Sequence, residues 1–296
     1  MRNIKIINDN WLFSKEAKAA PAALPTDWEQ KNIPYTWNEK DGQDGGNDYY
    51  RGKCFFAKSL LKADLPEGEE IYLQFDGVNS TAEVFFNGKS LIVHHGGYST
   101  FRVKLDDIKD ENLLVVSADN TANDFVYPQM ADFTFYGGIY RDVSVIGVPK
   151  KHFDLDYYGA PGISVTPIVK GDNAEVTAKA YCDGKVRFEI IEDGKVILSA
   201  EAEGENPEAK MTIENVHLWN GLADPYLYTL RAVLLDDGKE IDELSTRFGC
   251  RYFEVDPEKG FFLNGKAYPL RGVSRHQDRN DVGNALLLEH HKEDME

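Results

Sequence analysis

Apolar and polar residues alternate along much of the chain, which is the pattern of half-buried β-strands. The clearest runs are AEVFFNGKSLIV (82–93), KVRFEIIEDGKVIL (185–198), YLYTLRAVLLDDGKEI (226–241) and GFFLNGKAYPLRGV (260–273). Asn-Gly or Asp-Gly pairs, which tolerate the positive φ of tight hairpin turns, stand at 87–88, 183–184, 193–194, 237–238 and 264–265. Helical periodicity is absent until the last ten residues or so. The pattern therefore predicts a mainly β protein built from hairpins.

The spacing of these runs predicts three parts. Residues 1–150 combine many short strands with irregular connections and are rich in Trp, Tyr, Phe and Gly, which favours a jelly-roll sandwich. Residues 151–254 have strands separated by turns every 8–12 residues, which is typical of an immunoglobulin-like sandwich. Residues 255–296 offer a hairpin, a strand over YPLRGVS (268–274) and a helix within LLLEHHKEDME (286–296). One strand and one helix cannot bury their own faces, so we expect this part to belong to a larger domain.

Composition narrows the function classes. The chain carries 33 basic and 50 acidic residues, a formal net charge of −17, so binding to nucleic acids or anionic membranes is disfavoured. The sequence has no run of ~20 apolar residues and no leader of the signal-peptide type, and we expect a cytoplasmic protein, or a periplasmic or secreted one whose leader was removed. Three widely spaced cysteines (Cys54, Cys182 and Cys250) predict neither a disulfide framework nor a metal site, and we expect all three to be buried or half-buried.

Four stretches, in this order, resemble glycoside hydrolase family 2. They are NDYYRGKCFFAKSL (47–60), FYGGIYRDVSV (135–145), LWNGLADPYLYTL (218–230) and GFFLNGKAYPLRGVSRHQD (260–278). The resemblance implies a jelly-roll sugar-binding (galactose-binding-like) domain, an immunoglobulin-like sandwich and a (β/α)₈ catalytic barrel. Residues 255–296 would then be the first βα segment of an incomplete TIM barrel, which needs ~250 residues in all.

The resemblance also implies chemistry. Family members are retaining glycosidases that use two carboxyl groups ~5–5.5 Å apart. Both catalytic glutamates are expected beyond residue 296, so we expect these residues alone to be catalytically inactive. No cofactor is expected, although a cation (Mg or Na) is possible in the full-length enzyme. The full-length enzyme is also expected to be a homo-oligomer.

By the same resemblance, three residues are expected to bind substrate: Asp132, His276 and, more weakly, Asn47. An imidazole or a carboxylate suits sugar hydroxyls, because each can accept hydrogen bonds and the imidazole can also donate one. The other interpretations are a solvated loop histidine for His276 and an Asx-turn or helix-cap aspartate for Asp132.

Other residues of the four motifs are expected to be structural. Gly137 and Gly138 predict a tight turn, and the Arg141–Asp142 pair is expected to hold the sandwich to a neighbour. Arg271 and Arg275 are expected to pair with carboxylates of the barrel.

The favoured function is hydrolysis of terminal β-galactosides. Two alternatives stay open, which are a β-glucuronidase or another family 2 specificity, and a non-catalytic carbohydrate-binding protein.

Overall fold

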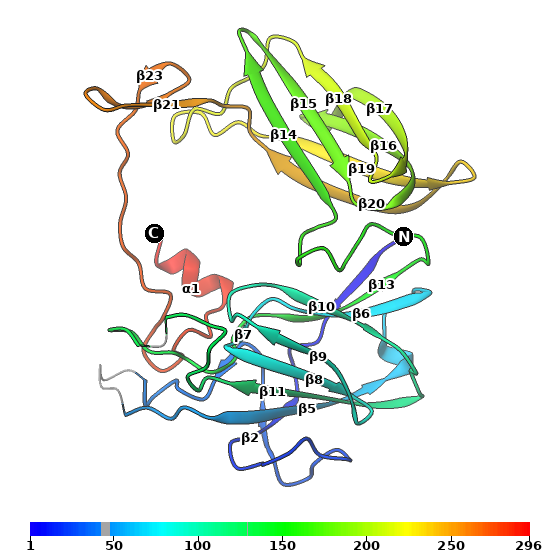
Figure 1. The fold of residues 1–296 in the computed structure, drawn as a ribbon, viewed down its shortest axis with the longest axis vertical. Coiled ribbons are helices and arrows are strands. Elements are labelled where there is room, and N and C mark those ends of the chain that lie inside the picture. Colours follow the sequence, from blue (N-terminus) through cyan, green and yellow to red (C-terminus); the bar gives the residue numbers. More distant parts are fainter. Residues whose placement is uncertain (43–47, 129) are drawn as a thin grey trace. The chain divides into compact units, whose positions relative to one another are not determined.

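The computed structural model describes residues 1–42, 48–128 and 130–296 (Figure 1). The chain forms two compact units. The jelly-roll unit comprises Asn3–Gly147 together with Arg275–Glu296, and the Ig-like unit comprises Met1–Arg2 together with Val148–Ser274. The domain boundaries expected at residues 150 and 254 stay a prediction. The C-terminal residues from Arg275 pack with the jelly-roll unit, and this placement builds the site described below.

The jelly-roll unit is a sandwich of two main sheets with a small third sheet at one end (Figure 1). The four-stranded sheet has the order β1 (Asn3–Ile6), β13 (Val143–Val148), β6 (Glu70–Phe75) and β10 (Phe101–Leu105). The six-stranded sheet has the order β3 (Glu29–Lys31), β2 (Trp11–Ser14), β5 (Lys53–Leu61), β11 (Glu111–Asp119), β8 (Thr81–Phe86) and β9 (Lys89–His95). The small sheet is β4 (Tyr35–Thr36), β12 (Gly138–Ile139) and β7 (Val78–Asn79). A 3₁₀ turn, η1 (Lys62–Asp64), and a helix, α1 (Leu288–Glu293), complete it.

The predicted alternation produces the core of this unit. In β8, Ala82, Val84 and Phe86 are buried while the residues between them are partly exposed. These side chains join one cluster with Trp11 and Phe56, both fully buried. Burial of apolar surface stabilises the sandwich by roughly 25 cal/mol per Å², so the cluster is the main source of its stability. The expected mainly β fold and jelly-roll sandwich are confirmed.

The Ig-like unit is a second sandwich with its own core. One sheet has the order β14 (Ile163–Lys170), β15 (Asn173–Ala180) and β18 (Glu208–Ile213). The other has the order β17 (Lys195–Glu205), β16 (Asp183–Glu192), β19 (Tyr228–Asp236) and β20 (Lys239–Phe248). A three-stranded sheet follows, formed by β21 (Phe253–Asp256), β22 (Gly260–Leu263) and β23 (Lys266–Ala267). The core includes Phe153, Phe188 and Leu230, and the expected immunoglobulin-like sandwich is confirmed.

Four of the five Asn-Gly or Asp-Gly pairs form the expected hairpin turns. They join β8 to β9, β16 to β17, β19 to β20 and β22 to β23, and each Asn or Asp has a φ between 47° and 51°. The fifth prediction was wrong, because Asp183 and Gly184 lie inside β16, where they pair with β17. The preceding strand β15 belongs to the other sheet, so the chain crosses between sheets here and no hairpin can form.

The strand expected over residues 268–274 is not formed. Within the described residues, the N–H of Tyr268 donates to the carbonyl oxygen of Phe261 at 2.9 Å, but no strand pairs with the rest of the stretch, and Leu270 and Val273 are 71 % and 92 % exposed. A strand needs a neighbour that satisfies its backbone groups, and the run lacks one here. The helix expected near the end of the sequence is confirmed as α1.

Among the described residues, no helix combines the length and the apolar character needed to cross a membrane. The three cysteines are unpaired, and two of them, Cys54 and Cys250, are buried. No group of three or more His, Cys, Asp or Glu side chains in the described part of the chain is arranged to hold a metal ion.

Candidate functional site

The C-terminal segment of the jelly-roll unit returns to the loop that precedes β12. Tyr136, at the end of this loop, is buried, and its hydroxyl donates a hydrogen bond to Asp278 Oδ2 at 2.9 Å. Gly283 adopts a positive φ of 55°, and a methyl group there would lie 2.8 Å from the Tyr136 ring and 2.9 Å from Thr36. Only a glycine permits this close approach. The segment is therefore fixed at two points, Asp278 and Gly283, and each contacts residues that lie 142 or more positions earlier in the sequence.

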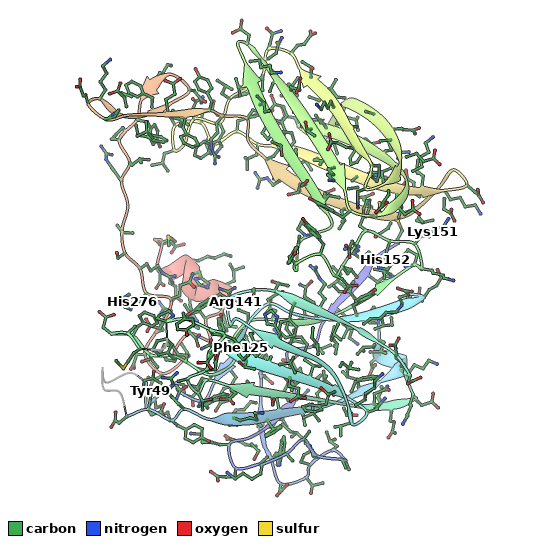
Figure 2. All side chains as sticks on the ribbon, viewed as in Figure 1. Tyr49, Phe125, Arg141, Lys151, His152 and His276 are labelled. Atoms are coloured by element: carbon green, nitrogen blue, oxygen red, sulfur yellow. The ribbon has the colours of Figure 1, made fainter. Side chains whose placement is uncertain are left out.

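The two segments enclose a cavity of about 580 Å³, which we call the His276 cavity. Its size lies within the usual range for small-molecule sites, ~300–1,000 Å³. The lining residues are Tyr98, Phe133, Thr134, Tyr136, Tyr140, Arg141, Arg275, His276, Gln277, Asp278, Asn284, Leu286 and His291. Figure 2 shows His276 and Arg141 at the same end of the unit.

Basic side chains outnumber acidic ones in this lining. It contains two arginines, Arg141 and Arg275, two histidines, His276 and His291, and one carboxylate, Asp278, and Arg275 is paired with Asp294. The cavity therefore favours a ligand with a negative group, or one whose hydroxyls accept hydrogen bonds.

Arg141 is the cation with the fewest competing charges. Its guanidinium lies over the rings of Tyr140 and Tyr98, at 5.4 and 5.9 Å from their centroids, and it donates only long bonds to the carbonyl oxygens of Tyr98 and Asp76. None of the ion pairs formed among the described residues involves Arg141. Asp142, beside it, accepts a hydrogen bond from Asn8 Nδ2 of the same unit at 2.9 Å, and the expectation that the two residues hold the sandwich to a neighbour stays a prediction.

Arg275 is held by a different charge. Its Nε donates to Asp294 Oδ2 at 3.0 Å, just after α1, and the same hydrogen bonding lowers the pKa of the Asp294 carboxyl. This partner lies within residues 255–296, the part expected to begin the barrel, and the expectation that Arg275 pairs with a barrel carboxylate stays a prediction. Arg271 is exposed.

One buried acceptor in the cavity has no partner. The side-chain oxygen of Asn284 is buried and receives no hydrogen bond in the described structure. Buried polar atoms are nearly always satisfied, so this oxygen needs a donor, either an ordered water or, where the side chain turns to the cavity, a ligand. A sugar hydroxyl is such a donor.

A network of buried amides holds the loop that carries Thr134 and Tyr136. Asn38 is fully buried, and its Oδ1 accepts hydrogen bonds from the backbone N–H of Gly137 at 2.9 Å and from Asn120 Nδ2 at 3.2 Å. Asn120 Nδ2 also donates to the carbonyl oxygen of Phe135 at 2.8 Å. The network therefore fixes the position of the loop that carries Thr134 and Tyr136.

The long loop 37–52 is joined to the same segment. The hydroxyl of Thr134 donates to the carbonyl oxygen of Gly42 at 2.7 Å, and the hydroxyl of Tyr49 accepts from the backbone N–H of Phe135 at 3.0 Å. Both ends of the long loop therefore support the cavity wall.

Two glycines shape the turn into β12. A methyl group at Gly137 would lie 2.0 Å from the Trp37 ring, and Gly138, with φ of 138°, would place one 2.3 Å from the carbonyl oxygen of Tyr35. Gly138 also pairs with both β4 and β7. The Gly-Gly pair expected to be structural is thus required by close packing.

The three predicted substrate residues have different positions. His276 lines the cavity and is exposed to it. Asp132 is exposed and does not line it, although its neighbours Phe133 and Thr134 do. Asn47 lies outside the described residues. Their roles in substrate binding stay predictions.

Sequence reasoning missed Tyr136, Asn284 and the amide network of Asn38 and Asn120. An asparagine that follows a strand usually signals a turn, so its sequence context gave no hint of a buried role. Tyr136 stands beside a recognised Gly-Gly pair, which was the only signal available.

Comparison with known proteins identifies the family of the chain. A model of the "Glycosyl hydrolases family 2, sugar binding domain" matches residues 2–149, and a model of "Glycosyl hydrolases family 2" matches residues 161–251. The chain belongs to glycosyl hydrolase family 2. The resemblance expected from the four motifs is thereby confirmed.

Named relatives of this family 2 chain fall into two groups. It is 36 % identical to a β-glucuronidase of Bacteroides fragilis over 98 % of this chain and 44 % of the relative. It is 30 % identical to a β-galactosidase of Thermoanaerobacterium thermosulfurigenes over 100 % of this chain and 43 % of the relative. The chain thus spans less than half the length of these two relatives.

A solved structure is also similar. It is that of an FMN-binding β-glucuronidase from Facaelibacterium prausnitzii L2-6, with a TM-score of 0.91 and 36 % identity, covering 99 % of this chain and 46 % of that one.

Proposed function

We propose that this family 2 chain is the N-terminal part of a retaining glycosidase that acts on β-glucuronides. The observation that carries the proposal is Arg141, which lines the His276 cavity and has no ion-pair partner among the described residues. A glucuronide carries a carboxylate at C6, whereas a galactoside carries a neutral hydroxyl there. The similar β-glucuronidases from two organisms support the same choice.

In this proposal the chain binds and orients the sugar. His276 exchanges hydrogen bonds with sugar hydroxyls, and the Asn284 side-chain oxygen accepts one from a further hydroxyl. Arg141 attracts the carboxylate, which also raises the rate of encounter with an anionic substrate. The two carboxyl groups that perform retaining hydrolysis would come from a barrel outside residues 1–296, so this chain alone would be inactive.

β-Galactosidase is the second candidate. It is favoured by the relative from Thermoanaerobacterium thermosulfurigenes, which matches the whole of this chain. Asp132 supports it as well, because an exposed carboxylate beside the cavity suits paired hydroxyls and would repel a uronate.

The experiment compares p-nitrophenyl β-D-glucuronide with the matching β-D-galactoside in the enzyme that carries this chain. We expect kcat/KM to favour the glucuronide by about 100-fold or more, or ~2.7 kcal/mol of transition-state binding. An equal or reversed preference rejects the proposed specificity. Residues 1–296 alone should hydrolyse neither substrate. Clear turnover by the purified chain would contradict the proposal that the catalytic carboxyl groups lie outside these residues.

Two substitutions test which residues contact the sugar. In the same enzyme, His276→Ala is expected to lower kcat/KM by ~10–100-fold without a change in the melting temperature, because the side chain is exposed. Asp132→Ala should weaken a galactosidase but leave a glucuronidase unchanged or improved. Lys151→Ala, an exposed change in the Ig-like unit, is the control.

A further inference from the structure

A second cavity of about 470 Å³ lies next to the His276 cavity in the jelly-roll unit, and the two share Tyr98 and Phe133 as walls. It is lined by the turn after β9 and by the segment that follows β11. Five of its lining residues are aromatic: Tyr98, Phe125, Tyr127, Phe133 and Phe135. We call it the aromatic cavity, and Figure 2 shows Phe125 at the same end of the unit as His276.

The aromatic walls are exposed. Phe125, Tyr127 and Tyr98 are 70 %, 74 % and 68 % exposed, although such rings are ordinarily half-buried or better. A cluster of exposed rings around a concave surface marks a place where an apolar group binds.

Phe125 is held in position before any ligand arrives. Its ring stacks on His95 at 4.2 Å between centroids with an angle of 22° between planes. The backbone N–H groups of Phe125 and Val126 both donate to Asn123 Oδ1, at 2.9 and 3.0 Å, which fixes the turn. One face of the ring is covered and the ring is largely open, so a ligand would lose little free energy in ordering it.

The polar groups at the base of this cavity are already used. Ser80 Oγ donates to the carbonyl oxygen of Asp119 at 3.0 Å, and Ser99 Oγ donates to that of Gly96 at 3.2 Å. Asn79 Nδ2 donates to the carbonyl oxygen of Tyr136 at 2.5 Å. With these three donors engaged, the cavity suits a flat apolar group better than a second sugar with its many hydroxyls.

We propose that the aromatic cavity binds the aglycone, a planar aromatic group β-linked to the sugar that occupies the His276 cavity. The assignment rests on the proposed glycosidase function. It makes Phe125 and Tyr127 residues that determine preference among aglycones and have no part in the bond cleavage. The shared walls, Tyr98 and Phe133, would separate the ring of the aglycone from the sugar.

The test uses the 296-residue protein and 4-methylumbelliferone, a planar phenolic aglycone, without any sugar. Binding is followed by saturation-transfer NMR during titration. We expect saturable binding that Phe125→Ala or Tyr127→Ala weakens about fivefold each, in line with the loss of one aromatic contact. Tyr158→Ala, which removes an 89 % exposed ring from the Ig-like unit, should leave binding unchanged. Thermal melts of all four proteins should coincide, because these rings are at the surface.

The outcomes separate this inference from the proposed specificity. No saturable binding, or equal weakening by Tyr158→Ala, overturns the aromatic cavity as an aglycone site. Displacement of the bound probe by cellobiose at the same concentration also overturns it, because that result indicates a sugar site. If the probe binds as expected while the enzyme prefers galactosides, the aglycone site stands and the glucuronide proposal fails.

Discussion

Replacement of Asn38 by alanine should cost the jelly-roll unit a large part of its stability. The Asn38 side chain is fully buried and takes part in four hydrogen bonds. It donates to the carbonyl oxygen of Tyr50 at 2.9 Å and to Asp41 Oδ1 at 3.1 Å, and it accepts from Gly137 N–H and Asn120 Nδ2. Asn38→Ala removes all four bonds at once.

The cost depends on which partners are left without a bond. Tyr50 O still accepts from Trp37 Nε1, Asn120 Nδ2 still donates to Phe135 O, and Asn120 Nδ2 also donates to Tyr50 O, so neither group is left without a partner. The buried N–H of Gly137 has no such substitute, and an orphaned donor costs ~1–3 kcal/mol. Three other lost hydrogen bonds add about 0.5–1 kcal/mol each, which gives a total of ~2.5–6 kcal/mol. Because a typical domain is stable by only ~5–15 kcal/mol, this loss is easily measured.

Tryptophan fluorescence during guanidinium unfolding is a suitable assay. Three of the four tryptophans lie in the jelly-roll unit and only Trp219 lies in the Ig-like unit, so the signal reports mainly the unit that carries Asn38. The matched control is Asn32→Ala, which removes an exposed side chain that accepts one bond from the N–H of Asn10 and should cost below ~1 kcal/mol. If Asn38→Ala costs no more than Asn32→Ala, the reasoning about the buried network is refuted.

Two further predictions concern the Ig-like unit and the thiols. Asp242 is fully buried and pairs with Arg2 at 2.9 Å, so Asp242→Ala should cost ~3–5 kcal/mol of unfolding free energy because the arginine is left without a counter-charge. The control Asp236→Ala breaks an exposed pair and should cost ~0–1 kcal/mol. Equal losses of the two variants in urea unfolding would contradict this prediction. Burial raises the pKa of all three thiols, so at about pH 8 the native protein should react slowly with Ellman's reagent and the unfolded protein rapidly. Since the fold disfavours the thiolate, stability should fall as the pH rises above the unfolded value of ~8.5 toward the raised values, and a rising or flat profile there would argue against buried thiols. The pKa values are raised to about 12 for Cys54, about 12 for Cys182 and about 11 for Cys250.

The fold could be predicted from the sequence because its signals are local. Alternation over 82–86 places Ala82, Val84 and Phe86 on one face, and the Asn87–Gly88 turn returns the chain beside itself. The failure at Asp183–Gly184 has the same origin. A turn-forming dipeptide indicates a tight change of direction only when the next strand pairs with the previous one, and pairing across the sandwich is not encoded locally.

The candidate site could be predicted only in part, because its walls come from distant segments. His276 was found through its motif and lines the cavity, and its role in substrate binding stays a prediction. The partners of the segment that contains it, Tyr136 and Thr36, are 140 residues or more away in sequence, and no periodicity relates them. Asn284 carries no motif at all, and only the fold shows that its oxygen is buried without a partner.

The way in which the C-terminal segment is held explains why this chain presents a formed cavity although no strand forms over residues 268–274. Asp278 receives a hydrogen bond from buried Tyr136, and Gly283 fits against the same ring. Ala285 and Leu286 are each only 8 % exposed, so apolar burial adds to these two contacts. The lining between Arg275 and His291 is therefore positioned by the jelly-roll unit itself. A cavity wall built in this way does not need a neighbouring barrel strand to exist, which is why ligand binding by the 296-residue protein is a meaningful test of both cavities.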